Sequence, residues 1–386
     1  MAEASMPGSG ASGGAGGLTG PDDAWCLDDV ERAAAAVLPD GVRDFVAGGA
    51  GGERTLRANR EAFGRLGLVP RVLRDVSRCA TDATLLGGRA RMPVAAAPVA
   101  YQRLVHPEGE LAAARAAKAA GVPFTVSTLS SVPLDKITAV GGRVWFQLYW
   151  LRDRERSLRL VRQAEDAGCE AVMLTVDVPW MGRRLRDARR GFALPEHVRA
   201  VNLDAGPVTR AHRGEGAGSA VAAHTALEFS PRLTWSVVEL LRSHTRLPLV
   251  LKGVLAPGDA RRACEFGVDA VVVSNHGGRQ LDGAVASVDA LGPVAEAVGG
   301  RCQVLLDSGV RGGTDVLKAL ALGASGVLVG RPPVWGLAAW GEAGAGRVYE
   351  LLAAELRDAL GLAGCPSVAA ARRLRVVCSG ALAPAG

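Results

Sequence analysis

The feature that most constrains the fold is a regular alternation, from about residue 92 onward, of short apolar runs with helical patterns. The apolar runs are rich in Val, Leu and Ala rather than strictly alternating, as expected for parallel strands covered on both faces. They span residues 92–99, 123–128, 144–150, 171–177, 248–254, 270–275, 303–308 and 326–330. The helical stretches between them include 108–120, 153–167, 256–266, 288–298 and 313–322. Eight such units predict an α/β fold, a closed TIM (β/α)8 barrel, rather than an open doubly wound sheet.

The domain organisation follows from the same pattern, with one barrel domain expected over residues 23–376. Within it, residues 24–75 are expected to form helices that precede the barrel and cap its lower face. The interval 191–231 comes after the fourth strand, and its length and weak periodicity predict a mobile active-site lid, with a plain spacer as the other interpretation. Gly, Ala and Ser dominate residues 1–22, which predicts a disordered tail, and 377–386 form a C-terminal tail.

The composition argues against membrane, nucleic-acid and metal binding. No apolar run approaches the roughly 20 residues of a membrane-spanning helix. The formal charge is +6, but the arginines are scattered, without the clustered stripe and stacking aromatics of a nucleic-acid surface. The seven cysteines are widely spaced, which indicates free thiols in a reducing cytoplasm, and no HExxH or comparable pattern indicates a metal site. We therefore expect a cytoplasmic protein that binds neither nucleic acid, membrane nor metal.

The last two strand ends favour a phosphate site. Glycines there let backbone N–H groups approach an anion without obstruction by a Cβ atom. They are Gly309, Gly312, Gly313 and Gly330. The helix that begins near Gly313 is expected to point its positive end at the same place, and Arg311 and Arg331 would add charge-assisted hydrogen bonds. Taken singly, each glycine is explained as well by a tight turn.

A histidine and an arginine follow the sixth strand, three residues apart. The His276 imidazole can take a proton near neutral pH, and the Arg279 guanidinium can clamp a carboxylate through two parallel hydrogen bonds. Asp177, at the end of the fourth strand, would orient the imidazole and stabilise its cation. This set suits proton abstraction from an acid that bears a hydroxyl on its α-carbon. The other five histidines are interpreted as structural.

Several of these motifs also identify a family. The chain resembles the FMN-dependent α-hydroxy acid oxidase and dehydrogenase family from about Leu27 to Arg375. The run SNHGGRQLD at 274–282 is highly specific, and it is accompanied by TLRANR at 55–60 and GGTDVLKALALG at 312–323. Residues 97–104 and 177–187 are most similar to family members that oxidise mandelate and 4-hydroxymandelate.

The resemblance implies a role for each matching position. His276 would be the base with Asp177 behind it, Arg279 and Arg184 would hold the substrate carboxylate, and Tyr149 would contact the substrate hydroxyl or carboxylate. Lys252 would lie near flavin N1, where its charge stabilises the reduced ring. The implied FMN-binding positions are Pro98, Val99, Ala100, Ser127, Gln147, Thr175, Lys252, Ser274, Asp307, Gly309, Arg311, Gly330 and Arg331.

Three positions depart from the common family pattern. Phe45 stands where a tyrosine often contacts the substrate carboxylate, and Leu129 stands where several oxidases of small hydroxy acids carry an aromatic ring. Both changes favour an aromatic substrate, with packing drift as the other explanation. Ser308 replaces a frequent glycine in the phosphate loop, and that change is expected to be tolerated.

The expected reaction is oxidation of an aromatic (S)-2-hydroxy acid, mandelate or 4-hydroxymandelate, to the 2-oxo acid. Oxygen would reoxidise FMN and yield hydrogen peroxide, in a role such as antibiotic biosynthesis, and the resemblance implies a homotetramer. Other possibilities are a dehydrogenase that passes electrons to a quinone or cytochrome, an oxidase of small aliphatic 2-hydroxy acids, and a monooxygenase course. A flavin-binding protein without turnover is a further class. Ala100 is similar to the oxidases, because several dehydrogenases carry glycine there.

Overall fold

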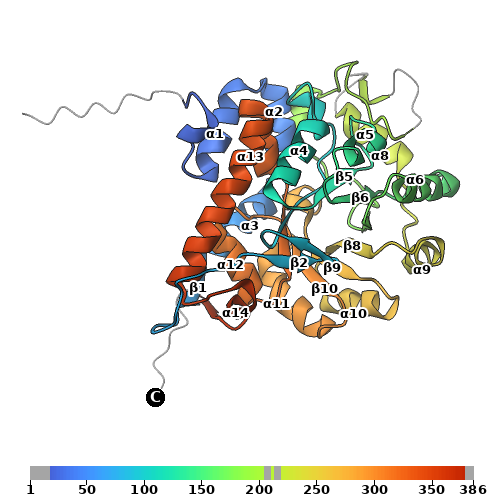
Figure 1. The fold of residues 1–386 in the computed structure, drawn as a ribbon. Helices are drawn as coiled ribbons and strands as arrows, with labels where there is room; N and C mark the ends of the chain where they lie inside the picture. The colour runs from blue at the N-terminus through green and yellow to red at the C-terminus, as the bar shows by residue number, and fades with distance from the viewer. Residues whose placement is uncertain (1–17, 204–209, 213–218, 379–386) are drawn as a thin grey trace, which may run out of the picture.

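A computed structural model describes residues 18–203, 210–212 and 219–378 (Figure 1). Most of the N-terminal tail predicted at 1–22 lies outside the described residues, but Pro21–Asp23 form a short 3-10 helix, η1. At the other end, residues 379–386 lie outside the description. Strand β12, Arg375–Cys378, pairs with β1, Leu66–Val69, so residues 377 and 378 belong to the folded part.

The core of the molecule is a closed barrel of eight parallel strands, which confirms the predicted fold class. Each strand lies within one of the predicted apolar runs. The strands in chain order are β4 (Val94–Ala96), β5 (Phe124–Ser127), β6 (Val144–Leu148), β7 (Ala171–Thr175), β8 (Leu249–Val254), β9 (Ala270–Val273), β10 (Gln303–Leu306) and β11 (Gly326–Val329). The barrel closes where β11 pairs with β4, with Val327 opposite Val94.

The barrel is solid because the strands are buried on both faces. Trp145, Met173 and Leu305 belong to one buried cluster of alternate strand residues. The strand residues between these, mostly Val and Leu, point outward and pack against the surrounding helices. The outer helices include α4 (Glu110–Ala120), α5 (Leu134–Thr138), α6 (Arg154–Asp166), α9 (Trp235–His244), α10 (Pro257–Glu265), α11 (Ser287–Val298), α12 (Gly313–Ala321), α13 (Arg331–Leu362) and α14 (Val368–Ala371).

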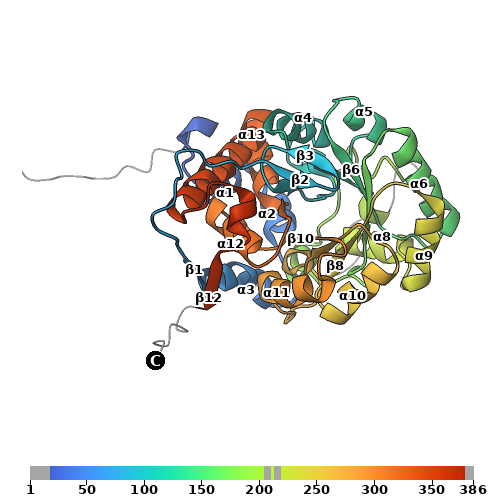
Figure 2. The same ribbon diagram turned by 60° about the horizontal axis from the view of Figure 1, so that its bottom comes forward.

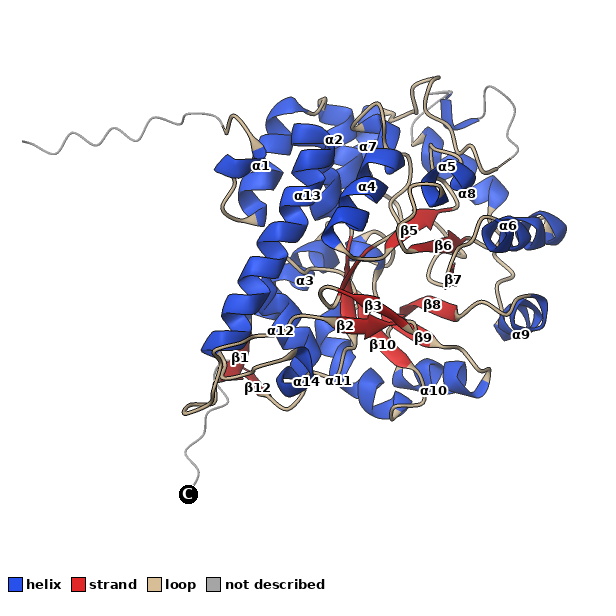
Figure 3. Ribbon diagram, in the orientation of Figure 1, coloured by secondary structure: helices blue, strands red, loops and turns tan. Residues whose placement is uncertain are grey.

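The N-terminal helices do not cap the lower face of the barrel, so that expectation is wrong. They are α1 (Leu27–Val37), α2 (Asp40–Ala47) and α3 (Arg54–Gly64). Helix α2 packs against α7 (Leu185–Arg190) and α3 against η4 (His276–Gly278), at the carboxyl ends of the strands (Figure 3). The cause is a set of long-range hydrogen bonds, such as the one that the Ala50 N–H donates to the Gly278 carbonyl at 2.8 Å.

A hairpin closes the lower end instead. Strands β2 (Ala83–Leu85) and β3 (Gly88–Ala90) pair antiparallel, and Figure 2 brings this end of the barrel forward. The Leu85 side chain is fully buried and belongs to the same cluster as the barrel interior. The hairpin therefore closes the barrel at the amino ends of the strands. The N-terminal helices lie at the opposite face, at the carboxyl ends.

The interval 191–231 is not structureless, because it contains η3 (Arg210–His212) and α8 (Ala220–Glu228). The Ser219 side chain caps α8 by accepting a hydrogen bond from the Ala222 N–H. The exposed side of this helix carries Ala223, Ala226 and Leu227 rather than charged residues, so the sequence shows no polar face with helical spacing. Residues 204–209 and 213–218 of the interval lie outside the described part, and the mobility of the segment stays a prediction.

Candidate active site

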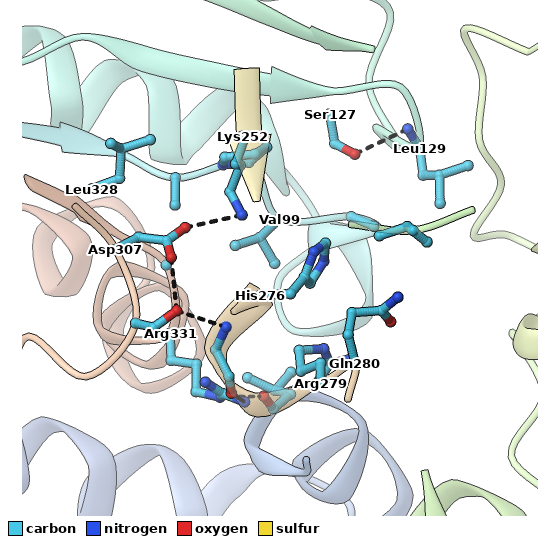
Figure 4. A pocket seen from close by; sticks show the side chains of 18 of the residues that line it. Val99, Ser127, Leu129, Lys252, His276, Arg279, Gln280, Asp307, Leu328 and Arg331 are labelled. Atoms are coloured by element: carbon cyan, nitrogen blue, oxygen red, sulfur yellow. Dashed lines mark hydrogen bonds and ion pairs between the residues drawn. The ribbon is translucent and has the colours of Figure 1, made fainter. Parts of the chain in front are cut away.

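One cavity lies at the carboxyl ends of the barrel strands and brings most of the predicted site residues together (Figure 4). The predicted residues that line it are Phe45, Pro98, Val99, Ala100, Ser127, Leu129, Tyr149, Arg184, Lys252, His276, Arg279, Asp307, Gly309, Arg311, Gly330 and Arg331. Four predicted residues lie behind this lining, where they support it. They are Gln147, Thr175, Asp177 and Ser274.

His276 and Asp177 form a hydrogen-bonded pair that orients the imidazole. The Nδ1 atom of His276 lies 3.0 Å from Oδ1 of Asp177. Burial lowers the pKa of His276 below its ordinary value, and the charge of Asp177 only partly opposes that shift. The carboxylate engages Nδ1, so the other ring nitrogen is left to face a ligand. His276 is therefore placed as a neutral base, and the Asp177 carboxylate would stabilise the imidazolium that forms when it takes a proton.

Two buried arginines face the same part of the cavity. The Arg279 Nη1 atom donates to the carbonyls of Phe45 and Gly48, each at 2.9 Å, and its guanidinium lies 5.5 Å from the centre of the Phe45 ring. The Arg184 guanidinium lies 5.9 Å from the same ring. Burial lowers the pKa of Arg279, and the charges of Arg184 and Arg331 lower it further. Cations gathered in this way are stabilised by an anionic ligand, such as a carboxylate.

Apolar and aromatic side chains form another part of the cavity wall. Tyr149 stacks on Phe229 with ring centres 4.3 Å apart, and burial raises the pKa of Tyr149 to about 12, so its phenol stays protonated. Leu129 and Met181 line the same cavity. The sequence interpretation missed much of this wall, since no motif marks an apolar residue as a contact. The missed lining residues include Val178, Met181, Val221, Thr225 and Phe229.

A chain of side-chain hydrogen bonds runs along the ends of three neighbouring strands. The Ser127 hydroxyl donates to Oε1 of Gln147 at 3.2 Å, and Nε2 of Gln147 donates to the Thr175 hydroxyl at 2.9 Å. Parallel pairing sets Ser127 opposite Gln147, so the register of the strands produces this row. The row orients polar groups beneath the floor of the cavity, as a heteroaromatic ring with several hydrogen-bonding atoms requires.

Strand β8 and the end of β10 contribute a buried lysine and its carboxylate. Lys252 Nζ lies 2.9 Å from Oδ2 of Asp307 and donates to the Ser274 hydroxyl at 3.1 Å. Burial lowers the pKa of Lys252, but the carboxylates of Asp307 and Asp177 outweigh that effect, and the net shift is upward. The lysine is thus a permanent cation at the cavity wall, suited to stabilise negative charge on a bound ring.

The anion-binding end of the cavity consists of Gly309, Gly330, Arg311 and Arg331. Burial lowers the pKa of Arg331 to about 9 and that of Arg311 to about 10. Among the described residues, the buried Nε of Arg311 has no hydrogen-bond partner. These groups fit the phosphate of FMN, because a doubly charged anion supplies an acceptor for Arg311 and the negative charge that the backbone carbonyls bonded to Arg331 do not.

Gly312 and Gly313 do not belong to this anion site, and here the sequence interpretation was wrong. A Cβ atom on Gly313 would lie 2.1 Å from the Leu356 backbone nitrogen, so this glycine permits α12 to pack against α13. The Gly313 N–H donates to the Glu355 carboxylate at 2.7 Å, which caps α12. The helix whose positive end reaches the cavity is α13, because Gly330 and Arg331 lie at its start.

The chain is similar to known proteins over nearly all its length. The FMN-dependent dehydrogenase family matches residues 34–377. A 4-hydroxymandelate oxidase of Amycolatopsis orientalis is 64% identical over 348 residues, which cover 90% of this chain and 97% of the relative. An L-lactate oxidase of Nostoc sp. is 46% identical over 344 residues, or 88% of this chain and 94% of the relative. A solved structure of mandelate oxidase with (S)-4-hydroxymandelic acid has a TM-score of 0.90 at 62% identity, covering 92% of this chain and 99% of that one.

Fold, cavity and sequence similarity agree on one assignment. The barrel strands and all the residues that line the FMN-compatible cavity lie within the matched residues 34–377. The chain therefore belongs to the FMN-dependent dehydrogenase family.

Proposed function

We propose that this chain oxidises an aromatic (S)-2-hydroxy acid, mandelate or 4-hydroxymandelate, to the 2-oxo acid, with oxygen reduced to hydrogen peroxide. One observation carries the proposal: a single cavity brings together His276, which Asp177 holds from behind, two largely buried arginines and an apolar wall. The named relatives support it, because the 4-hydroxymandelate oxidase and the L-lactate oxidase are both oxidases.

The residues divide the work as follows. Arg184 and Arg279 bind the substrate carboxylate and so present the α-carbon and its hydroxyl to His276. His276 takes a proton from the substrate, and the nearby Asp177 carboxylate stabilises the imidazolium that results. FMN, when bound, supplies the two-electron acceptor for this oxidation. Lys252 holds a positive charge at the cavity wall throughout.

The wall formed by Leu129, Met181 and Val221 supports an aromatic substituent on the α-carbon. Phe45 adds a face that carries no hydroxyl, and it stacks on Phe192 with ring centres 4.9 Å apart. A phenyl group buried against these side chains gains free energy by leaving water, whereas the methyl group of lactate leaves much of the surface uncovered.

The test is anaerobic mixing of the FMN-loaded protein with (S)-mandelate, (S)-4-hydroxymandelate, lactate and glycolate. We expect the flavin absorbance to bleach fastest with the two aromatic acids. Failure to bleach with any aromatic 2-hydroxy acid contradicts the proposal. Under air, one peroxide per keto acid is the oxidase outcome, a low peroxide yield with quinone-dependent turnover is the dehydrogenase outcome, and benzoate formation marks a monooxygenase course.

The rate is expected to depend on pH through His276. Only the unprotonated imidazole accepts a proton, and burial lowers the pKa of His276, so the active form is complete at neutral pH. We expect kcat/KM for mandelate to be constant from about pH 7 upward and to fall about tenfold per pH unit once the pH drops below this pKa, which lies under the ordinary value of about 6.5.

The matched variant for this pH dependence is Asp177→Asn. The Asp177 charge raises the pKa of His276, so its removal should move the acid limb to still lower pH while reducing the plateau. Stopped-flow measurement of FMN reduction across pH 4.5–9 checks both curves. An acid limb centred above pH 7 in the wild type would contradict a buried neutral base.

Leu129→Trp is expected to shift the substrate preference toward small acids. The Leu129 side chain is buried and lines the apolar wall, so a larger ring there takes the space of the substrate phenyl group. We expect kcat/KM for mandelate to fall at least about tenfold relative to that for lactate. Leu129→Met, which conserves volume, is the control. An unchanged mandelate-to-lactate ratio in the tryptophan variant would place the aryl group elsewhere.

We further propose a cytoplasmic homotetramer. Two large apolar side chains near the cavity loops, Trp180 and Leu281, are exposed in the single chain, as expected for a surface that is covered in an assembly. Among the described residues, no helix combines the length and the apolarity needed to cross a bilayer. Mass photometry of the FMN-loaded protein tests the tetramer directly, and a monomer peak alone would contradict it.

A further inference from the structure

Ser308 connects the loop of the catalytic base to the lysine–carboxylate pair at the cavity wall. The Gly277 N–H donates to the Ser308 hydroxyl oxygen at 2.8 Å, and the same hydroxyl donates to Oδ1 of Asp307 at 2.7 Å. The other carboxylate oxygen of Asp307 lies 2.9 Å from Nζ of Lys252. Figure 4 shows the contact between Lys252 and Asp307 as a dashed line beside His276. One hydroxyl thus bridges two strand-end loops that carry different functions.

The connection closes into a ring of hydrogen bonds. Lys252 donates to the Ser274 hydroxyl at 3.1 Å, and the same oxygen accepts the backbone N–H of His276 at 3.0 Å. The path therefore leaves the β9 loop at Gly277, passes through Ser308, Asp307 and Lys252, and returns to the β9 loop at Ser274. His276 lies between the two ends of the path, so the ring fixes its backbone on both sides.

The backbone at both key residues is strained. Ser308 has φ +72° and His276 has φ +59°, in the left-handed region that favours glycine. A glycine at position 308 would adopt this conformation without strain. A residue held at a conformational cost beside a functional loop indicates that its side chain has a role there.

We propose that Ser308 is a positioning residue, whose hydroxyl holds the His276 loop in register with Lys252 and reduces the negative charge that Asp307 presents to that lysine. The inference rests on the proposed function for His276, but its charge component does not. Without the hydroxyl, the Asp307 carboxylate neutralises more of the Lys252 charge, and an anionic reduced flavin beside this lysine becomes less stable. The flavin midpoint potential should then become more negative.

Two substitutions separate the hydroxyl from the strain. Ser308→Ala removes the hydroxyl and keeps the Cβ at positive φ, whereas Ser308→Gly removes the hydroxyl and relieves the strain. We expect both to lower the rate constant of anaerobic FMN reduction by mandelate about tenfold, the scale of one lost hydrogen bond to a charged group, with substrate Kd within about twofold. The melting temperature of the glycine variant should exceed that of the alanine variant. Ser243→Ala, at an exposed serine of α9, is the control.

The midpoint potential is measured by dithionite titration of the FMN-loaded protein, which requires no substrate. A midpoint potential that becomes more negative in both Ser308 variants, but is unchanged in Ser243→Ala, supports the proposal. This result holds even if the protein does not oxidise mandelate. If the glycine variant reduces FMN like the wild type and only the alanine variant is slow, strain explains the effect and the proposal is overturned. Unchanged potentials with unchanged reduction rates overturn it as well.

Discussion

Replacing His276 with asparagine should lower the rate constant of FMN reduction by mandelate about 10²–10⁴-fold, the usual contribution of a general base. Asparagine is the sharper substitution, because His276 has φ +59° and asparagine tolerates the left-handed region better than alanine does. The ring nitrogen that faces the ligand is lost in both variants, so His276→Asn and His276→Ala should be equally slow. Stopped-flow absorbance under anaerobic conditions measures the rate constant.

The control for this experiment has two parts. FMN binding should persist in both variants, since the anion-binding end at Arg311 and Arg331 does not involve the imidazole. His244→Ala, at an exposed histidine on α9, should leave the rate constant unchanged. A His276 variant that binds FMN and reduces it at the wild-type rate would remove histidine from the mechanism.

Replacing Arg279 with methionine should lower kcat/KM for mandelate about 10²–10³-fold. The guanidinium is partly buried, and loss of one partner of a desolvated charge pair costs on the order of 2–5 kcal/mol. Arg279 also donates to the Phe45 and Gly48 carbonyls, so the methionine variant loses stability too. The diagnostic quantity is therefore a ratio of ligand affinities rather than a rate alone.

That ratio compares benzoylformate with its uncharged amide, each titrated against the flavin absorbance. Arg279→Met should weaken the carboxylate far more than the amide, because only the carboxylate exchanges a charge with the arginine. Arg279→Lys should retain part of the preference for the carboxylate over the amide, because lysine keeps the positive charge but lacks the planar guanidinium. Equal weakening of both ligands in the methionine variant would reduce Arg279 to a structural role.

The barrel was predictable because burial leaves a direct mark on sequence. All eight strands fall inside apolar runs, since a parallel strand covered on both faces requires apolar residues throughout. Many of the charged and polar site residues were predictable too, because they lie at or just beyond a strand end. His276, Lys252 and Arg331 were found in this way, and all line one cavity. Arg184, by contrast, was expected only from the family resemblance.

What escaped prediction depends on contacts that cross large separations in sequence. The N-terminal helices were assigned to the wrong face, because the bond between Ala50 and Gly278 has no local signature. Gly313 looked like an anion contact until its approach to Leu356 was known. Nothing in the sequence indicated a role for Ser308, because that role depends on the two groups that its hydroxyl connects, the Gly277 N–H and the Asp307 carboxylate. Helix α8 lacked a polar face that would have marked its period.

The docking of the N-terminus has a consequence for the order in which this protein can fold. Helix α1 packs against α13, one of the last elements to be synthesised, and the Asn59 amide donates to the Asn275 side chain across 216 residues. The N-terminal helices are synthesised first, but they can form these contacts only after the barrel and α13 have been synthesised. Contacts of such length make folding slow, and they make it cooperative across the whole domain. A fragment that lacks α1 to α3, or α13, is therefore expected not to assemble the catalytic face.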